Sequence, residues 1–252
     1  DAKINYVSMR LSELEIEDGY GDFSYIDIVE AEFELSNNQE KETSFAPFVA
    51  FYDGDGSLVD AKRAVAQTVE KGTTAVFSVT TEKLDAEACE IFVLDNNISP
   101  YASVGKGEMG KTVVSATGAS LENMAVGNLV ISKEVGDGEV SLNKVTINGN
   151  LVIQGGGSNS IKLNSCRVLG RLIANKALGD MPRVELTATP IEQIEVKNPM
   201  IIETTDDASG IGRIVTTKDV TIRGENTTIK KITVDEKTES EISLIVPDGL
   251  QT

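Results

Sequence analysis

Six short segments in the C-terminal half of the chain repeat one pattern: Gly127-Asn128-Leu129-Val130-Ile131, Gly149-Asn150-Leu151-Val152-Ile153, Gly170-Arg171-Leu172-Ile173-Ala174, Glu192-Gln193-Ile194-Glu195-Val196, Gly212-Arg213-Ile214-Val215-Thr216 and Lys230-Lys231-Ile232-Thr233-Val234. Their central residues are 22, 21, 22, 20 and 18 positions apart. A second apolar strand precedes most copies, as Val140-Ser141-Leu142 precedes Leu151. A coil with one apolar face can bury that face only by stacking on its neighbours, so this periodicity is typical of a β-solenoid. The sequence therefore predicts a parallel β-helix of about six coils over residues 128–252.

Two columns of side chains follow from this alignment. The central aliphatic residues should stack in one buried column: Leu129, Leu151, Leu172, Ile194, Ile214 and Ile232. Asn143 and Asn164 share a second column and are either the members of an amide ladder or two ordinary turn residues.

The N-terminal part of the chain has a different composition. Residues 1–97 contain 21 acidic and 7 basic residues, whereas residues 98–252 contain 19 and 16. Of the 12 Phe and Tyr residues, 11 precede residue 98, and Tyr101 is the last aromatic residue. Such a shift indicates a domain boundary, which we place in a linker or cap over residues 98–127.

Short strands dominate the predicted first domain, residues 1–97. Residues 27–35 alternate, with Val29, Ala31, Phe33 and Leu35 on one face. Further strands are predicted at residues 45–52, 73–80 and 90–94, and Asp53-Gly54-Asp55-Gly56 is a hairpin signal. Residues 60–69 fit either a helix or a strand. This pattern predicts an immunoglobulin-like β-sandwich.

Several segments resemble surface proteins of clostridia and related Gram-positive bacteria. In the second domain these are residues 135–140, Val145-Thr146-Ile147, residues 150–153 and residues 155–161. In the first domain they are Phe51-Tyr52-Asp53 and residues 91–95. The resemblance implies an immunoglobulin-like module followed by a pectate-lyase-like, right-handed β-helix, outside the cell or at its surface. Such proteins often carry S-layer-homology anchors, of which we see no copy in this sequence.

Composition excludes several function classes. The formal net charge of −17 disfavours nucleic acid as a partner. Because the chain has no His, Ser-His-Asp triads and His-ligated metals are excluded. No apolar run approaches the ~20 residues of a membrane span, so no membrane insertion is expected. Cys89 and Cys166 are predicted to be free buried thiols, and a chain beginning at Asp1 fits a mature secreted or a trimmed protein.

One segment matches a nucleotide-binding motif in its letters. Residues 105–112, Gly-Lys-Gly-Glu-Met-Gly-Lys-Thr, fit the phosphate-loop pattern, in which Lys111 would contact phosphates and Thr112 a magnesium ion. A phosphate loop follows a buried strand and opens a helix, whereas the β-branched residues after Thr112 disfavour a helix. We therefore interpret this segment as part of the linker and expect no nucleotide to bind.

Acidic residues at predicted turns are the candidates for metal binding and catalysis. Asp53 and Asp55 resemble a calcium site but lack the distal Glu of an EF-hand loop, and a hairpin turn explains the same residues. Asp137 and the pair Asp206-Asp207 lie at predicted solenoid corners, and lyases of the resembled fold bind calcium near such acids. All of these acids are equally explained as turn residues.

Basic residues on aligned coils are the candidates for glycan binding. Arg171, Arg213 and Lys231 could hold an acidic glycan or could simply keep the solenoid surface solvated. The sequence thus predicts a non-catalytic extracellular module with a structural or adhesive role, without catalytic, cofactor-binding or metal-binding residues. The expected partners are cell-wall or host polysaccharides or proteins. The alternative is a β-helix that binds or cleaves polysaccharides.

Overall fold

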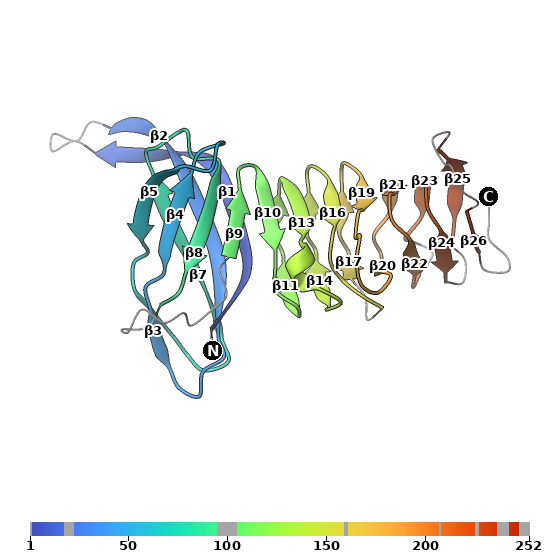
Figure 1. Ribbon diagram of the computed structural model, residues 1–252, viewed down its shortest axis with the longest axis horizontal. Helices are drawn as coiled ribbons and strands as arrows, with labels where there is room; N and C mark the ends of the chain where they lie inside the picture. Colours follow the sequence, from blue (N-terminus) through green and yellow to red (C-terminus); the bar gives the residue numbers. More distant parts are fainter. Residues whose placement is uncertain are drawn as a thin grey trace. The chain divides into compact units, whose positions relative to one another are not determined.

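The computed structural model describes residues 2–17, 23–94, 105–158, 161–206, 208–224, 227–235 and 242–246, with only the backbone of Phe23. The chain divides into two compact units, Asp1–Val113 and Val114–Thr252. Both consist of β-strands, with one short 3-10 helix, η1 (Lys133–Val135), in the described part (Figure 1). The prediction of an all-β chain is confirmed, with a β-solenoid of about six turns after an antiparallel β region. Among the described residues, no helix has the length and apolar character of a membrane span.

Unit 1 is built on one long hairpin. Strands β1 (Ala2–Glu17) and β2 (Phe23–Asn37) pair antiparallel, and β7 (Thr74–Thr81) pairs with β2. A second set of strands contains β5 (Leu58–Arg63), β4 (Phe48–Tyr52), β8 (Ala88–Phe92) and β9 (Gly105–Glu108), each antiparallel to the next. Two shorter strands, β3 (Thr43–Phe45) and β6 (Gln67–Val69), form a separate pair.

The core of unit 1 follows the predicted alternation in β2. Val29, Ala31, Phe33 and Leu35 are all fully buried, and the ring of Phe33 stacks on that of Phe77 with centroids 5.5 Å apart. The predicted strand over residues 45–52 is interrupted at residues 46–47, where Pro47 lacks an N–H for a ladder. Residues 60–69, which fitted either a helix or a strand, contain the end of β5 at residues 60–63 and the whole of β6 at residues 67–69. The longest strand, β1, had no counterpart in the sequence analysis.

Unit 2 is a solenoid with up to three strands in each coil. One row contains the six predicted strands: β13 (Asn128–Ile131), β16 (Leu151–Ile153), β19 (Leu172–Ala174), β21 (Ile191–Val196), β23 (Ile211–Thr216) and β25 (Ile229–Val234). The second row contains β11 (Ala119–Glu122), β14 (Val140–Asn143), β17 (Ile161–Asn164), β20 (Arg183–Thr187), β22 (Met200–Thr204), β24 (Val220–Arg223) and β26 (Leu244–Ile245). A short third row, absent from the predicted two-strand pattern, contains β12 (Ala125–Val126), β15 (Thr146–Ile147) and β18 (Arg167–Val168). Figure 1 shows these strands following one another along the unit.

The predicted aliphatic column is confirmed. Leu129, Leu151, Leu172, Ile194, Ile214 and Ile232 are successive partners in parallel register. The first five are fully buried, and Ile232 in the last coil is half-buried. A column of this kind gives each coil an apolar neighbour above and below, so every internal coil depends on both.

The segment predicted as a linker or cap has a different organisation. Its residues 98–104 lie outside the described residues. The following residues form β9, β10 (Lys111–Val114), β11 and β12, and β11 already pairs in register with β14. The boundary between the two compact units falls within β10. After it, β11 and β12 already pair in parallel with β14 and β15, as the later strands of the solenoid do with their neighbours.

In the described part of the solenoid, four turns use a left-handed residue that is not glycine. Asn123, Lys144, Ser165 and Ala188 have φ of 53°, 52°, 53° and 46°. This conformation costs about 1–2 kcal/mol per residue. The N–H groups of Asn123, Lys144 and Ser165 each donate to a carbonyl oxygen one coil further on, at 2.9 Å. The stacked coils therefore fix these turns by hydrogen bonds between neighbouring coils.

Asparagine side chains form a ladder of hydrogen bonds from coil to coil, but with main-chain N–H groups instead of amide to amide, and not at the predicted pair. Asn143 and Asn164 are partners in register, yet the Asn143 amide donates to Glu122 at 3.5 Å. The ladder runs instead through Asn128 and Asn150: the Asn128 side-chain oxygen accepts the N–H of Asn150, and the Asn150 oxygen accepts the N–H of Arg171, both at 2.9 Å. Side-chain oxygens thus replace carbonyl acceptors at the start of the strand row.

Candidate functional site

Asp137 belongs to a contact that joins two loops of the solenoid. The Lys176 side chain is 4 % exposed, and its ammonium group donates to the Asp137 carboxylate and, at 2.7 Å, to the Asp180 carbonyl. Asp137 Oδ1 also accepts the Asp180 N–H at 2.9 Å. The hydrogen bond from Lys176 lowers the pKa of Asp137. This carboxylate is therefore held ionised, with its acceptor capacity partly used by the fold.

Two glycines pack closely against the loop that carries Asp137. A Cβ on Gly157 would lie 2.5 Å from the Asp137 carbonyl oxygen, and one on Gly155 would lie 2.2 Å from the Ser132 carbonyl oxygen. The loop between Asp137 and Lys176 in the stack therefore has no room for side chains at these positions. Asp137 and Lys176 are 39 residues apart, about two coils, and they meet beside this glycine loop.

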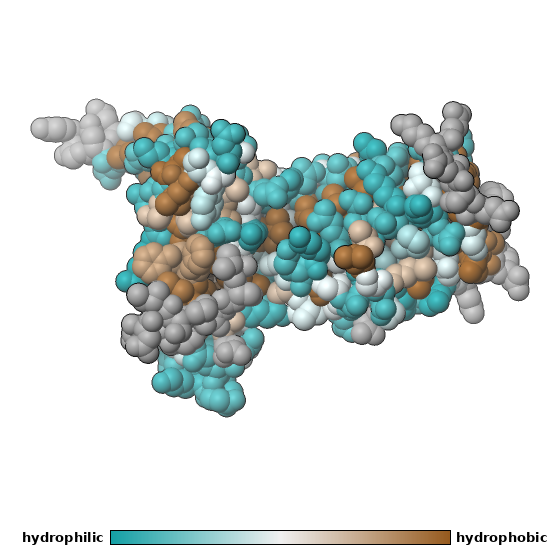
Figure 2. All heavy atoms as spheres, in the orientation of Figure 1, coloured by the Kyte–Doolittle hydropathy of each residue, from teal (hydrophilic) through white to brown (hydrophobic). Residues whose placement is uncertain are grey.

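Asp137 and Lys176 themselves line part of a groove of about 800 Å3. Lys133, Gln154, Asn175 and Leu178 are among its lining residues, and Leu178 is 86 % exposed. Figure 2 shows hydrophilic side chains over most of the visible face of unit 2, interrupted by a few hydrophobic ones. Two side-chain amides, a cation and an apolar side chain are groups that can bind a polar ligand, because they supply donors, acceptors and contact area together.

Asp206 fixes the fourth left-handed turn. Its Oδ2 accepts the N–H of Ala188 at 2.6 Å, where the other three turns use a carbonyl oxygen. Its Oδ1 accepts the hydroxyl of the buried Ser209 at 2.7 Å, and this bond is the main reason that the pKa of Asp206 is lowered. Ser209 in turn accepts the N–H of Thr189 at 3.0 Å. Asp207, predicted as the second acid of this pair, lies outside the described residues.

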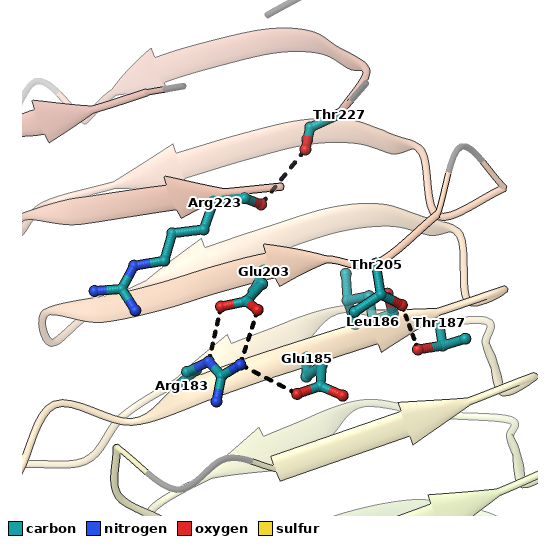
Figure 3. A network of polar contacts seen from close by, with 8 residues as sticks. All are labelled: Arg183, Glu185, Leu186, Thr187, Glu203, Thr205, Arg223 and Thr227. Carbon is teal, nitrogen blue, oxygen red and sulfur yellow. Dashed lines mark hydrogen bonds and ion pairs between the residues drawn. The ribbon is translucent and has the colours of Figure 1, made fainter. Parts of the chain in front are cut away.

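An ion-pair network lies on the outward face of the second strand row (Figure 3). Arg183 Nε and Nη2 donate to the two carboxylate oxygens of Glu203, both at 2.8 Å, and Nη2 also donates to Glu185 at 3.2 Å. The three side chains are 22–24 % exposed. The bond from Arg183 lowers the pKa of Glu203, and the reciprocal bond raises the pKa of Arg183. This network was not predicted, because its signal in the sequence is only a pair of opposite charges 20 residues apart, the length of one coil.

The acidic hairpin between β4 and β5 is organised by its own backbone. Asp53 Oδ1 accepts the N–H groups of Asp55 and Ser57 at 3.0 and 2.8 Å. The Asp53 N–H donates to the Ser57 carbonyl at 2.9 Å, and Gly56 has φ of 82°. The predicted hairpin is confirmed, and the Asp53 carboxylate serves as its internal acceptor. Within the described part of the chain, no three His, Cys, Asp or Glu side chains are grouped as metal ligands.

The phosphate-loop letters fall on an antiparallel hairpin, β9–β10. A Cβ on Gly105 would lie 2.8 Å from the Ile4 side chain, and one on Gly107 would lie 2.7 Å from that of Val7. The glycines are therefore required where β9 packs on β1. Lys111 forms an ion pair with Glu108 at the exposed turn. The interpretation as linker differs from this hairpin, and the absence of nucleotide binding stays a prediction.

The aligned basic residues lie on one column of exposed positions. Arg213 and Lys231 are partners in register, and Arg171 precedes Leu172 two coils earlier. Arg171 donates to Glu195 at 3.1 Å, an exposed ion pair.

Both predicted free thiols, Cys89 and Cys166, are confirmed as free and buried, and burial raises the pKa of Cys89 to about 12. A thiol of that pKa is protonated at neutral pH and is a poor nucleophile.

Comparisons with known proteins show a distant structural similarity to pectate lyases with β-helices. No family model and no curated protein matches the chain. Pectate lyase PelI from Erwinia chrysanthemi is 12% identical over 94% of this chain and 77% of its own, with a TM-score of 0.27. Pectate lyase Pel3 from Pectobacterium carotovorum is 11% identical over 94% of this chain and 83% of its own, with a TM-score of 0.19.

Proposed function

We propose that the protein is a non-catalytic module of a bacterial cell-surface or secreted protein, with a structural or adhesive role. One observation carries the proposal: the acids singled out as candidates for chemistry serve the fold. Asp206 fixes a turn, Asp137 joins two loops, and Asp53 organises a hairpin. General acid–base and metal chemistry need carboxylates aimed at a ligand, whereas these aim at the protein's own N–H and ammonium groups.

The proposal includes the finer architecture that the resemblance implies. Unit 1 would be an immunoglobulin-like sandwich, and unit 2 a right-handed β-helix of the kind carried by Gram-positive surface proteins. The antiparallel pairing and aromatic core of unit 1 and the parallel in-register coils of unit 2 support this assignment. A repeat unit of stacked coils offers an extended surface, which suits a spacer or an adhesin.

Polysaccharide binding or cleavage is the second candidate function. The groove lined by Gln154, Asn175 and Leu178 favours it, and so does the exposed column that contains Arg213 and Lys231. Amide side chains form paired hydrogen bonds with hydroxyl groups, and cations on successive coils match the charge of an acidic glycan.

One experiment separates these roles. The full chain is incubated with pectic, uronic and neutral polysaccharides, with and without calcium, while retention, unsaturated product and reducing ends are measured. We expect no product with any substrate, and retention without turnover would favour adhesion over a passive spacer. Turnover that is lost in Asp206→Ala would contradict the proposal and identify an enzyme. The variant Glu139→Ala, at an exposed acid in another coil of unit 2, is the control.

A further inference from the structure

We propose that the end of the β1–β2 hairpin docks a basic, extended segment of a partner protein. This arm consists of residues 13–17 of β1 and 23–27 of β2, which pair with each other from Glu13–Asp27 to Glu17–Phe23. The pairing of β2 with β7 begins only at Val29. Figure 1 shows the two blue strands reaching beyond the other strands of unit 1. An isolated two-stranded hairpin is at best marginally stable in water, whereas three strands with a covered face are stable.

One face of the arm is apolar and, within the described part of the chain, partly exposed. Leu14 and Ile26 are directly opposite in register, and Ile16 lies two residues along on the same face. Leu14 is 43 % and Ile16 is 40 % exposed. Figure 2 shows hydrophobic side chains among hydrophilic ones at this end of unit 1. Covering such a strip stabilises a complex by about 25 cal/mol for each Å2 of apolar surface removed from water.

The apolar strip continues into a groove at the base of the arm. Leu14 and Ile28 line this groove, which has a volume of about 480 Å3. Ile28, on the same face of β2 as Ile26, is buried. Polar residues of β5 and of the segment at the end of β7 form the remaining walls. The Asp60 carboxylate accepts the Thr81 hydroxyl at 2.6 Å and is paired with Lys62 at 3.6 Å, and Glu82 and Lys83 also line the groove. The charges in the groove therefore balance, and the acidic character of the site lies on the arm. An extended segment on the arm can therefore run into a preformed groove, which lowers the conformational cost of docking.

Charge identifies the occupant as basic. Residues 11–29 contain six acidic residues and no Lys or Arg. On the opposite face of the arm, Glu13 lies directly across from Asp27, and Glu15 and Glu17 follow along the same strand. Like charges directly opposite each other destabilise a strand pair. A second copy of this chain would bring the same acidic residues together. A partner segment that pairs with the edge of β2 at residues 23–27, beyond the end of β7, directs alternate side chains to the two faces of the arm. Its Lys and Arg side chains can then reach Glu13 and Asp27 while its apolar side chains cover the strip.

The test uses the full chain and a labelled synthetic peptide that alternates Lys with Val. Peptides alternating Lys with Ser and Glu with Val are the probe controls, and binding is followed by fluorescence anisotropy. We expect the Lys–Val peptide to bind and the two controls to bind at least about tenfold more weakly. Raising the salt concentration should weaken the Lys–Val complex, because exposed charges are screened.

Two double variants locate the site. Leu14→Ser with Ile16→Ser removes the apolar strip, and Glu13→Gln with Glu15→Gln removes charge while relieving repulsion within the arm. Each should weaken binding about tenfold, whereas the exposed changes Val65→Ser and Glu70→Gln outside the arm should not. Glu13→Gln with Glu15→Gln removes charges that repel each other within the arm, so this variant does not destabilise the arm. A loss of affinity in this variant therefore reports the loss of contacts with the peptide.

Four results would overturn the inference: no binding of the Lys–Val peptide, equal binding by all variants, equal binding of the Lys–Ser peptide, or a homodimer by sedimentation that Leu14→Ser with Ile16→Ser dissolves. Binding of the wild-type chain to phosphatidylcholine vesicles that the same variant abolishes would instead indicate a membrane contact. The inference rests on an adhesive role for unit 1, and the peptide assay succeeds or fails independently of the polysaccharide experiment.

Discussion

Leu172→Ala tests the stacking of the solenoid most simply. Leu172 is fully buried, with Leu151 and Ile194 as its partners in the neighbouring coils. The substitution removes three carbon atoms, about 2.4 kcal/mol at about 0.8 kcal/mol for each CH2 group. The neighbouring strands are held at about 4.8 Å by their hydrogen bonds and cannot close the cavity, which adds a further penalty. We expect a total loss of about 3 kcal/mol in the free energy of unfolding of unit 2.

The distribution of aromatic residues allows the two units to be followed separately. All 5 Tyr residues precede residue 102, so tyrosine fluorescence reports unit 1, whereas far-ultraviolet circular dichroism reports both units. Leu172→Ala should lower the dichroism transition of unit 2 by about 10 °C and leave the fluorescence transition in place. Arg171→Ala, which removes only an exposed ion pair at 3.1 Å, should cost less than about 1 kcal/mol. Equal shifts for the two variants would refute the register.

Three further predictions concern an ion pair, a hydrogen bond and a close backbone approach in unit 2. The pKa of Glu203 is lowered in the folded state, so the carboxylate contributes stability above its unfolded pKa of about 4.3, and this contribution is lost as the pH falls through the folded pKa. Arg183→Gln should remove this pH dependence from the free energy of unfolding, measured by urea denaturation between pH 7 and pH 3. Asn150→Ala should cost about 1–2 kcal/mol in the same assay because it removes the acceptor for a main-chain N–H, whereas Asn150→Asp keeps an oxygen and should cost less. Gly157→Ala should clearly lower the transition temperature of unit 2, because the added Cβ would lie 2.5 Å from a backbone oxygen. Gly210→Ala is the control, since a Cβ there would have no atom within 4 Å. Similar shifts for both variants would contradict the close stacking of the loops.

The aliphatic column could be predicted because two independent periods coincide in the sequence. Alternation within a strand places Leu151 and Ile153 on one face, and the coil spacing places Leu151 beneath Leu172. The third strand row escaped prediction because strands of two residues, such as β15, are too short to show alternation. In β1 a bulge between Ile4 and Tyr6 breaks the period, and residues 4–7 are all buried.

The candidate site was less accessible to sequence analysis. Lys176 and Asp137 meet across two coils, and a contact at that distance has no signature in a one-coil repeat. The ladder at Asn128 and Asn150 was missed because these residues resemble turn residues, and only their stacked N–H partners distinguish them. Gly105 matched a phosphate loop because close packing, here against the Ile4 side chain, and phosphate binding both demand a position without a side chain.

Asp137 and Asp206, acids that resemble part of a catalytic set, hold coils of the solenoid together, and the free energy of unfolding of Asp206→Ala measures this role. The change leaves the Ala188 N–H and the buried Ser209 hydroxyl without their acceptor, so we expect a loss of about 2 kcal/mol in denaturant unfolding followed by circular dichroism. Glu139→Ala, at an exposed acid, should stay within about 0.5 kcal/mol of the parent chain. Residues retained for function are often destabilising, and replacing them commonly stabilises a protein. An Asp206→Ala variant as stable as its parent, or more stable, would contradict the structural role of Asp206 between the coils.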